Sequence, residues 1–490
     1  MPKDFVYDDA TALVQSIQNG QISSRELLES QIERINKYNK HINSCVAFDY
    51  DNARILADQA DLAIKRQAPL GKLHGIPMTI KDAFKVKGMP CTDGNPEFQH
   101  YVPTENAVSV NKLVGAGAIP FAKTNVPFKC ADIQTYNKFY GTANNPWNLN
   151  LTTGGSSGGS AAALASGFTP IELGSDIGGS IRTPAHFCGV YGHKSTYGLI
   201  DFRGHIMNYE DELSQPDLVV IGPMARSARD LSLLLDVLVE PNADDFRAFK
   251  LKESEKQTIQ EFKVLFWMDD ESCPIDSRLK KKYDQLLQTL QTAKVNVDVG
   301  RPKNWDFDEI FKSYATRLIS QMTFADPKLS RLSMSASTPL IKLLNGKAGI
   351  PPLAYGFTQG ANLSHAEWLA KYEESLHIKQ KCLEIFAEYD VIICPPILTL
   401  AFEHNHKEPL MFRTLQVDGR KRFYLELFKW ISPATVFGLP STSAPIGLSE
   451  DNLPVNIQIL GQPYADKVTI KFAELLAQIT DGFQKPPLDF

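Results

Sequence analysis

The chain has 490 residues, of which 43% are hydrophobic and 22% charged, and its formal net charge is −5. This composition is ordinary for a globular protein, and the length allows a large core. The small negative charge argues against a nucleic-acid-binding protein. Seven scattered cysteines without a C-x-x-C pair favour a reduced, cytoplasmic protein. Because neither a signal pattern nor an apolar run of membrane-spanning length is found, we expect no membrane partner.

The first part of the chain alternates predicted helices and strands. Ser23 and Glu26 have the spacing of a capping box in "QISSRELLESQIERINKYN", which predicts a helix there. The apolar stretch in "HGIPMTIKDAFKVKG" predicts a strand that ends in a charged pair, Lys81 and Asp82. A helix, a Gly-rich turn and a strand are expected in "NAVSVNKLVGAGAIPFAKTN". This order is typical of α/β architecture.

The second part adds a helix-rich segment and further strands. "SARDLSLLLDVLVEP" predicts a helix stopped by Pro241, and "KVLFW" predicts a strand. Long helices are expected in "DSRLKKKYDQLLQTLQTA" and in "SHAEWLAKYEESLHIKQKCLEIFAEY", which opens with a capping box of Ser364 and Glu367. "DVIICPP" and "LPVNIQILG" predict two more strands. The fold class is therefore α/β, with one large mixed sheet core surrounded by helices and a helix-rich insertion at about 245–390.

A Gly/Ser-rich stretch stands between ordered elements. It reads "GGSSGGS" at 154–160, and "GSDIGGSIRTPA" follows from Gly174. A linker is disfavoured because "AAALASGFTPIELGSD", between the two runs, predicts a helix and a strand. A nucleophile elbow, G-x-S-x-G, needs a core strand directly before it, and "NNPWNLNLTT" is a poor strand. A phosphate-binding loop lacks its lysine, so we favour a functional backbone loop.

No histidine is marked out as a catalytic base or a metal ligand. His186 and His193, in "PAHFCGVYGHK", are interpreted as packed structure. "EHNHK" at 403–407 lacks the spacing of a known metal site and is interpreted as a solvated loop. We therefore expect no metal and no other cofactor.

The sequence "GGSSGGSAAALASGFTPIELGSDIGGSIRTPAHFCGVYGHKSTYG" resembles the core of the amidase signature family of serine hydrolases. "LHGIPMTIKDAFKVKGMPCTDG", "DLVVIGPMARSARDLSLLLDVL" and "SPATVFGLPSTSAPIG" extend the resemblance over nearly the whole chain. The resemblance implies one amidase domain over residues 1–490. Its core signature spans about 70–240, a divergent substrate-side region about 245–390, and C-terminal core elements about 390–490.

Three catalytic residues follow from the resemblance. Ser180 matches the nucleophile that forms an acyl-enzyme, and Ser156 matches the bridging serine that follows a cis peptide bond, here after Gly155. Lys81 matches the general base. A lysine accepts a proton only in its neutral form, which burial favours. Ser156 would then relay the proton between Ser180 and Lys81.

The resemblance also implies an oxyanion hole built from backbone N–H groups. Glycines in this turn let a substrate carbonyl approach the backbone closely. The expected donors are Ile177, Gly178, Gly179 and Ser180.

Supporting roles are implied for Ser157, Asp176 and Arg182. Asp176 and Arg182 either pair with each other to shape the loop or contact the substrate. Many relatives have Arg-Thr-Pro where this chain has Leu151, Thr152 and Thr153, and "GHKST" replaces "GLKPT". These departures leave the reaction class unchanged but put the substrate class in doubt.

A stand-alone amidase that acts on a small-molecule amide is the expected function. The alternatives are the amidase subunit of a glutamyl-tRNA amidotransferase, an ester-preferring relative, and a non-catalytic small-molecule-binding relative. No nucleic-acid partner is expected, and the assembly is left between a monomer and a homodimer. The walls of the substrate pocket are expected at about 200–215 and 300–390, where aromatic residues are interpreted first as core.

Overall fold

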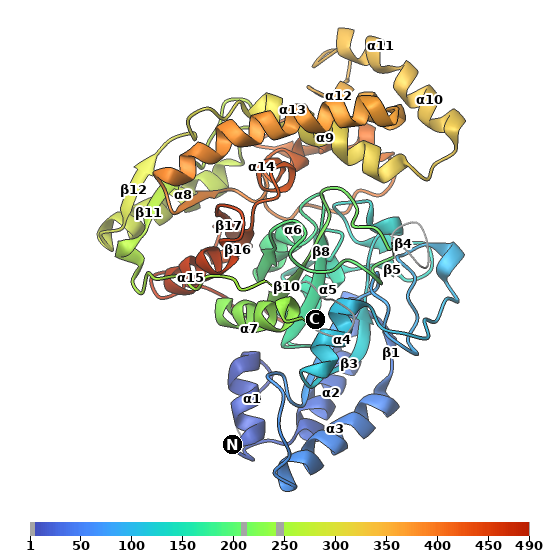
Figure 1. Ribbon diagram of the computed structural model, residues 1–490, viewed down its shortest axis with the longest axis vertical. Helices are drawn as coiled ribbons and strands as arrows, with labels where there is room; N and C mark the ends of the chain where they lie inside the picture. The colour runs from blue at the N-terminus through green and yellow to red at the C-terminus, as the bar shows by residue number, and fades with distance from the viewer. Residues whose placement is uncertain (1–4, 207–212, 242–248, 490) are drawn as a thin grey trace.

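A computed structural model describes residues 5–206, 213–241 and 249–489 of the protein (Figure 1). Its largest sheet has eight strands. In spatial order they are β12 (Asn296–Val299), β11 (Lys263–Phe266), β13 (Val391–Cys394), β17 (Pro454–Leu460), β16 (Ser441–Leu448), β9 (Tyr191–Lys194), β10 (Val220–Ala225) and β8 (Ile171–Asp176).

The eight-stranded sheet is mixed. β11 is parallel to both of its neighbours, β12 and β13, and every pair from β13 to β8 is antiparallel. The α/β fold class and the mixed sheet predicted from the sequence are thus confirmed. β11 and β12 come from the segment expected to be a helix-rich insertion, so that segment also extends the sheet.

A second sheet positions the end of the strand that carries Lys81. It has the order β1 (Cys45–Phe48), β3 (Ala118–Thr124), β2 (Ile76–Lys81), and β2 runs parallel to β3 with Lys81 opposite Thr124. β2 packs beside β8 of the main sheet. The Thr79 hydroxyl donates to Glu172 across this contact at 2.9 Å. The two sheets therefore meet beside Lys81.

Three short hairpins complete the strands of the described chain. They are β4 (Tyr136–Asn137) with β5 (Gly141–Thr142), β6 (Asn144–Asn145) with β7 (Asn148–Thr152), and β14 (Thr414–Val417) with β15 (Arg420–Phe423). The segment "NNPWNLNLTT" forms β6 and β7, so it does contain strands. Neither β6 nor β7 belongs to the eight-stranded sheet. The loop is therefore not preceded by the core strand that a nucleophile elbow needs.

Helices surround the two sheets (Figure 1). The α-helices are α1 (Ala10–Gln18), α2 (Ser24–Ile42), α3 (Tyr50–Lys65), α4 (Val108–Gly115), α5 (Gly158–Ala165), α6 (Arg182–Cys188), α7 (Ala228–Val239), α8 (Ser277–Thr292), α9 (Phe307–Thr323), α10 (Lys328–Ala336), α11 (Thr338–Leu343), α12 (Tyr355–Gln359), α13 (His365–Leu383), α14 (Ser432–Val436) and α15 (Asp466–Leu476). The short 3₁₀ helices are η1 (Pro96–Phe98), η2 (Phe128–Cys130), η3 (Ile259–Glu261), η4 (Gly360–Asn362), η5 (Glu384–Ala387), η6 (Leu410–Phe412) and η7 (Tyr424–Phe428).

Local sequence signals explain where several helices begin. Ser23 with Glu26, and Ser364 with Glu367, form the two predicted capping boxes at the starts of α2 and α13.

In Figure 1, α9 to α13 lie at the opposite end of the molecule from α1 to α3. None of the described helices combines the length and apolarity that crossing a bilayer requires.

Helix α5 is buried along its whole length. Its sequence, GGSAAALA, consists almost entirely of small residues, and it packs against β2, β8 and α6. Small side chains let these backbones approach closely. The loop that precedes α5 is thereby held between the strand ends of both sheets.

Glu172 of β8 is the most informative buried acid of this core. It accepts hydrogen bonds from Thr79 at 2.9 Å, from Thr124 at 2.8 Å and from the backbone N–H of Leu173 at 2.7 Å. Burial raises the pKa of its carboxyl from the ordinary 4.5 to about 7, although these donors oppose the shift.

Replacing Glu172 with glutamine should flatten the pH dependence of stability. Below pH 7 the native protein holds a proton that the unfolded chain releases near pH 4.5. The wild type therefore loses stability, on the order of 3 kcal/mol, as the pH rises through this window. Urea unfolding at several pH values measures the effect. A wild-type-minus-variant difference in unfolding free energy that stays constant with pH would contradict it.

Candidate active site

Lys81 ends β2, and its side chain is fully buried. Its Nζ lies 2.7 Å from Oγ of Ser156 and 2.9 Å from Oγ of Ser175. In the described residues no carboxylate forms an ion pair with this amine. Burying a charged amine without a counter-ion is costly, so these surroundings suit a lysine that works as a base.

Lys123 on the adjacent strand β3 is equally buried but has different partners. Its Nζ forms an ion pair with Asp82 at 3.3 Å and donates to the carbonyls of Phe84 at 2.7 Å and Pro90 at 3.1 Å. A counter-ion and two carbonyls are the partners of a charged ammonium. Lys123 therefore has the partners of a structural lysine, which distinguishes it from Lys81.

Ser156 lies in the loop between β7 and α5, directly after a cis peptide bond to Gly155, as the resemblance implies. A side chain at Gly155 would not fit, because a Cβ there would lie 2.5 Å from the carbonyl oxygen of Asp132 and 2.8 Å from the carbonyl carbon of Ile133. The backbone of 132–133 thus packs directly against the loop, and only glycine permits this approach.

Ser180 lies in the turn between β8 and α6. Gly179 before it has a φ of +84°, which favours glycine. The backbone N–H of Ser157 donates to the carbonyl of Ser180 at 3.1 Å, so the two serine loops are tied together. Within the described chain the Ser180 hydroxyl makes no hydrogen bond, which leaves it available to a substrate.

The predicted oxyanion donors differ in their availability. The N–H of Gly179 donates to Oδ1 of Asp176 at 3.0 Å and is therefore already engaged. No described acceptor receives the N–H groups of Ile177, Gly178 or Ser180, and these three residues line a cavity. The four donors stay a prediction, and three of them are free of other acceptors in the described chain.

Asp176 and Arg182 form a fully buried ion pair at 2.9 Å. Asp176 also accepts from the N–H of Ile181 at 3.1 Å, and Arg182 donates to the carbonyl of Ile431 and to Gln458, each at 3.0 Å. Although burial alone would raise the pKa of Asp176, the Arg182 guanidinium lowers it. Of the two roles left open for this pair, the contacts favour shaping the Ser180 turn.

Two polar residues beside Lys81 were not predicted. The hydroxyl of Ser175, on β8, accepts from Lys81 and lies 2.8 Å from Nε2 of His205. Ser175 lies immediately before Asp176 in the motif, so its position could have drawn attention. His205 follows in a segment without a recognisable pattern, and no sequence signal marked it.

Cys130 and Asp93 lie on the other side of Ser156, and neither was predicted. Asp93 is fully buried and Cys130 is partly buried, and neither carboxyl oxygen of Asp93 has a hydrogen-bond partner among the described residues. Burial raises the pKa of the thiol, and it raises the pKa of the Asp93 carboxyl well above its ordinary range. Burial therefore favours the uncharged forms of both groups near the serine.

A cavity of about 210 Å³ opens beside Ser180. Its far walls are almost entirely apolar and consist of Leu318, Ile319, Met322, Phe357, Leu410, Met411, Leu425 and Phe428. The lining acid, Asp132, is engaged by Arg413 at 2.6 Å and by the Tyr424 hydroxyl at 2.7 Å. The cavity thus suits an uncharged, apolar group.

The walls of the substrate pocket stay a prediction. Of the residues that form the far walls of this cavity, Leu318, Ile319, Met322 and Phe357 fall in the expected 300–390 segment, whereas Leu410, Met411, Leu425 and Phe428 lie beyond it. Of the other expected segment, 200–215, residues 207–212 lie outside the described chain.

A family model for the amidases matches residues 26–470 of this chain. The chain belongs to the amidase family. Because the match covers most of the chain, the resemblance drawn from the motifs is confirmed.

Similar proteins span nearly the full length of this amidase. A glutamyl-tRNA(Gln) amidotransferase subunit of Natranaerobius thermophilus is 28% identical, with 96% of this chain and 95% of that protein covered. Fatty-acid amide hydrolase 2-B of Danio rerio is 27% identical, with coverages of 97% and 90%. The solved structure of a bacterial aryl acylamidase of the amidase signature family has a TM-score of 0.77 at 22% identity, covering 96% of each chain. This likeness shows the amidase signature fold.

The histidines considered from the sequence are structural in this amidase. Nδ1 of His186 accepts from the N–H of Asn456 at 2.8 Å, and burial lowers the pKa of His186 to about 4. His193 pairs with Asp466 at 3.0 Å. His404 and His406 are half-buried, and the described residues contain no cluster able to hold a metal ion.

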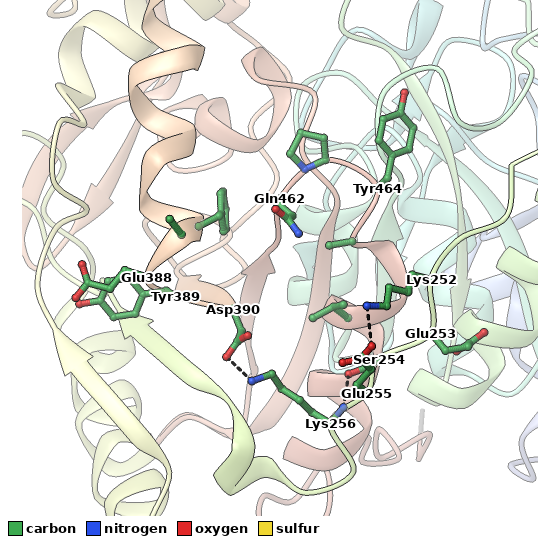
Figure 2. Close-up of a pocket in the computed structure, with 15 residues that line it drawn as sticks. Lys252, Glu253, Ser254, Glu255, Lys256, Glu388, Tyr389, Asp390, Gln462 and Tyr464 are labelled. Carbon is green, nitrogen blue, oxygen red and sulfur yellow. Dashed lines mark hydrogen bonds and ion pairs between the residues drawn. The ribbon is translucent and has the colours of Figure 1, made fainter.

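A second cavity of about 300 Å³ lies away from the serines, near the start of α15. Figure 2 shows that charged side chains surround it, and that these pair with one another: Lys252 with Glu255 at 2.7 Å and Lys256 with Asp390 at 2.9 Å. Neither the Lys81 group nor another buried nucleophile lines it. This cavity is not a candidate for the amidase chemistry.

Replacing Asp176 with asparagine should destabilise the protein by about 3 to 5 kcal/mol, because Arg182 would remain as an uncompensated buried charge. Urea unfolding measures the loss. The matched control is Asp51→Asn, which removes one partner of Arg54 from an exposed ion pair and should cost at most about 1 kcal/mol. Equal losses in the two variants would show that the buried pair does not hold the turn.

Proposed function

We propose that this amidase hydrolyses a carboxylic acid amide with an apolar acyl group to the acid and ammonia or an amine. The supporting observation is the hydrogen bond between Lys81 and Ser156 beside Ser180, which opens onto an apolar cavity. The proposed base, relay and nucleophile come from β2, the loop before α5 and the turn after β8. No metal or cofactor takes part in the proposed reaction.

In the proposed acylation step, Oγ of Ser180 attacks the amide carbon. Its proton passes to Ser156 as the proton of Ser156 passes to Lys81. The free N–H groups of Ile177, Gly178 and Ser180 stabilise the developing oxyanion. When the C–N bond breaks, Lys81 returns a proton through Ser156 to the leaving nitrogen, and an acyl ester remains on Ser180.

Deacylation reverses these proton movements with water. A water molecule attacks the ester carbon and gives its proton through Ser156 to Lys81. The tetrahedral intermediate then collapses, the acid leaves, and the Ser180 hydroxyl regains its proton. The same base and relay therefore serve both half-reactions.

The cavity lining supports an apolar acyl group. Burying apolar surface is worth about 25 cal/mol per Å², and walls of Leu, Ile, Met and Phe offer such burial to an acyl chain. A carboxylate or ammonium on the acyl group would be desolvated there without a free partner, because Asp132 is engaged by Arg413.

The alternative is the glutaminase activity of an amidotransferase subunit. A relative of that kind is 28% identical to this chain, which keeps the alternative open. The cavity disfavours it, because glutamine carries both an ammonium and a carboxylate. An assay that compares ammonia release from glutamine with release from simple apolar amides separates the two functions. The glutamine assay is run with and without tRNA partners. An ester-preferring or non-catalytic relative would release no ammonia from either.

The remaining features of the proposal follow from the sequence. We place the enzyme in the cytoplasm as one amidase domain over residues 1–490, acting on a small molecule without a nucleic-acid or membrane partner.

Ser180→Ala should abolish both ammonia release from apolar amides and labelling by a fluorophosphonate probe, because it deletes the attacking hydroxyl. The control is Ser157→Ala, since Ser157 contacts Ser180 through its backbone N–H, which alanine retains. Labelling, single-turnover assays and unfolding curves measure the two variants. Full labelling of the Ser180 variant, or its loss in the Ser157 variant alone, would assign the nucleophile to Ser157.

Lys81→Ala should reduce the rate by roughly 10²- to 10⁴-fold, and Ser156→Ala by a smaller factor, because the nucleophile remains while the relay is broken. Burial lowers the pKa of His186 to about 4. Titration of that ring therefore cannot cause a change in rate near pH 6.5, the ordinary pKa of histidine. An acidic limb that vanishes in a His186 or His193 variant, with Lys81→Ala still active, would overturn the assignment.

A further inference from the structure

The turn that carries Ser180 contains three peptide groups between Ile177 and Ser180. In a planar trans peptide the carbonyl and the N–H point to opposite sides, so a hydrogen bond to one of them also orients the other. Within the described chain only the bond between Gly155 and Ser156 is cis. The hydrogen-bond partners of this turn therefore decide the direction in which the predicted oxyanion donors face.

Two of the three peptide groups are held by residues close by in the chain. The N–H of Gly179 donates to Oδ1 of Asp176 at 3.0 Å, which restrains the peptide that joins it to Gly178. The carbonyl of Gly179 accepts from the N–H of Thr183 at 2.7 Å, which restrains the peptide that ends in the N–H of Ser180. These contacts are local to the turn and to the start of α6.

The third peptide group, between Ile177 and Gly178, is held by a side chain from a distant helix. The hydroxyl of Tyr314, on α9, donates to the carbonyl of Ile177 at 3.2 Å. A Cβ on Gly178 would lie 3.5 Å from the same hydroxyl oxygen, so Tyr314 packs closely against this peptide. Tyr314 is fully buried, and burial raises the pKa of its phenol well above the ordinary range. The hydroxyl therefore keeps its proton and stays a donor.

Tyr314 shares a face of α9 with two walls of the apolar cavity. Leu318 and Met322 follow it at the spacing of about one and two helical turns, and both line the cavity. Gly178 lines the same cavity, and no described acceptor receives its N–H. One face of α9 therefore contacts both the space proposed for the acyl group and a peptide of the Ser180 turn.

We propose that Tyr314 is a positioning residue: its hydroxyl holds the carbonyl of Ile177, so that the N–H of Gly178, on the opposite side of that peptide, faces the oxygen of a bound amide. The inference rests on the proposed function, in which this N–H stabilises the oxyanion. Tyr314 neither touches the reacting atoms nor gives up a proton. It restricts the orientation of the peptide before the substrate binds, and such preorganisation is what makes a hydrogen-bond donor effective in catalysis.

Tyr314→Phe removes the hydroxyl and keeps the ring. Because deleting an oxyanion donor costs about 10²- to 10³-fold in kcat, a donor that is present but no longer held should cost less, about 10- to 100-fold, with little change in KM. The matched control is Tyr283→Phe, since the buried Tyr283 hydroxyl also donates to a backbone carbonyl, that of Asn456 at 3.0 Å, away from the cavity. Urea unfolding should show similar losses of stability in both variants, and only Tyr314→Phe should lose kcat. Replacing Tyr314 with p-aminophenylalanine, which keeps a donor at the same position, should recover most of the rate.

A pair of ketones tests the oxyanion without turnover. In an alkyl trifluoromethyl ketone, Oγ of Ser180 bonds to the carbonyl carbon, its proton passes through Ser156 to Lys81, and the carbonyl oxygen becomes an oxyanion. The methyl ketone with the same alkyl chain fills the cavity but adds much less readily. The wild type should bind the trifluoromethyl ketone more tightly, and in Tyr314→Phe this preference should fall by the same factor as kcat, because both depend on the stability of the oxyanion.

Three results would overturn the inference: an unchanged kcat or an unchanged ketone preference in Tyr314→Phe, equal losses of kcat in Tyr283→Phe, or no recovery with p-aminophenylalanine. Wild-type protein that binds the two ketones equally would instead contradict the proposed function, and the role of Tyr314 would fall with it. Calorimetric titration of the two ketones and steady-state kinetics on an apolar amide supply all of these measurements.

Discussion

The architecture of the site depends on the burial of one amine, that of Lys81, between two hydroxyls. Lys123, one strand away, is a structural lysine for comparison. It forms an ion pair with Asp82 and donates hydrogen bonds to two backbone carbonyls. Lys81 receives neutral partners instead, from β8 and from the loop before α5. Those partners reach it because β2 packs beside β8 and because α5 has side chains small enough to lie against both strands.

The buried ion pair of Asp176 and Arg182 stabilises the other part of the site, the turn that carries Ser180. One carboxylate accepts from the backbone of the Ser180 turn and from Arg182, while Arg182 reaches across to the carbonyl of Ile431. A charge pair with this many hydrogen bonds can remain buried where an isolated charge could not. Asp176 also accepts from the N–H of Gly179, one of the four predicted oxyanion donors.

Several helices and strands of the fold could be predicted from the sequence, because local sequence signals determine local structure. The capping boxes of α2 and α13, the strand ending at Lys81 and the α/β alternation depend on neighbouring residues and are all present. Ser156, Ser180 and Lys81 were assigned by motif, and their roles stay predictions. His205 could not be found in this way, because only the tertiary fold brings it within hydrogen-bond distance of Ser175.

The residues proposed for the reaction and the far walls of the apolar cavity come from different parts of the chain. The groups proposed to do chemistry come from Lys81 to Ser180, whereas the cavity walls come from α9, α12, η6 and η7. These two parts meet through Phe428, which lies where a Cβ on Gly178 would approach its ring to 2.9 Å. A larger residue at 178 would therefore disturb a predicted oxyanion donor and a cavity wall together. Changes in the far walls, by contrast, can alter the shape of the cavity while the hydrogen bonds of Lys81 stay intact.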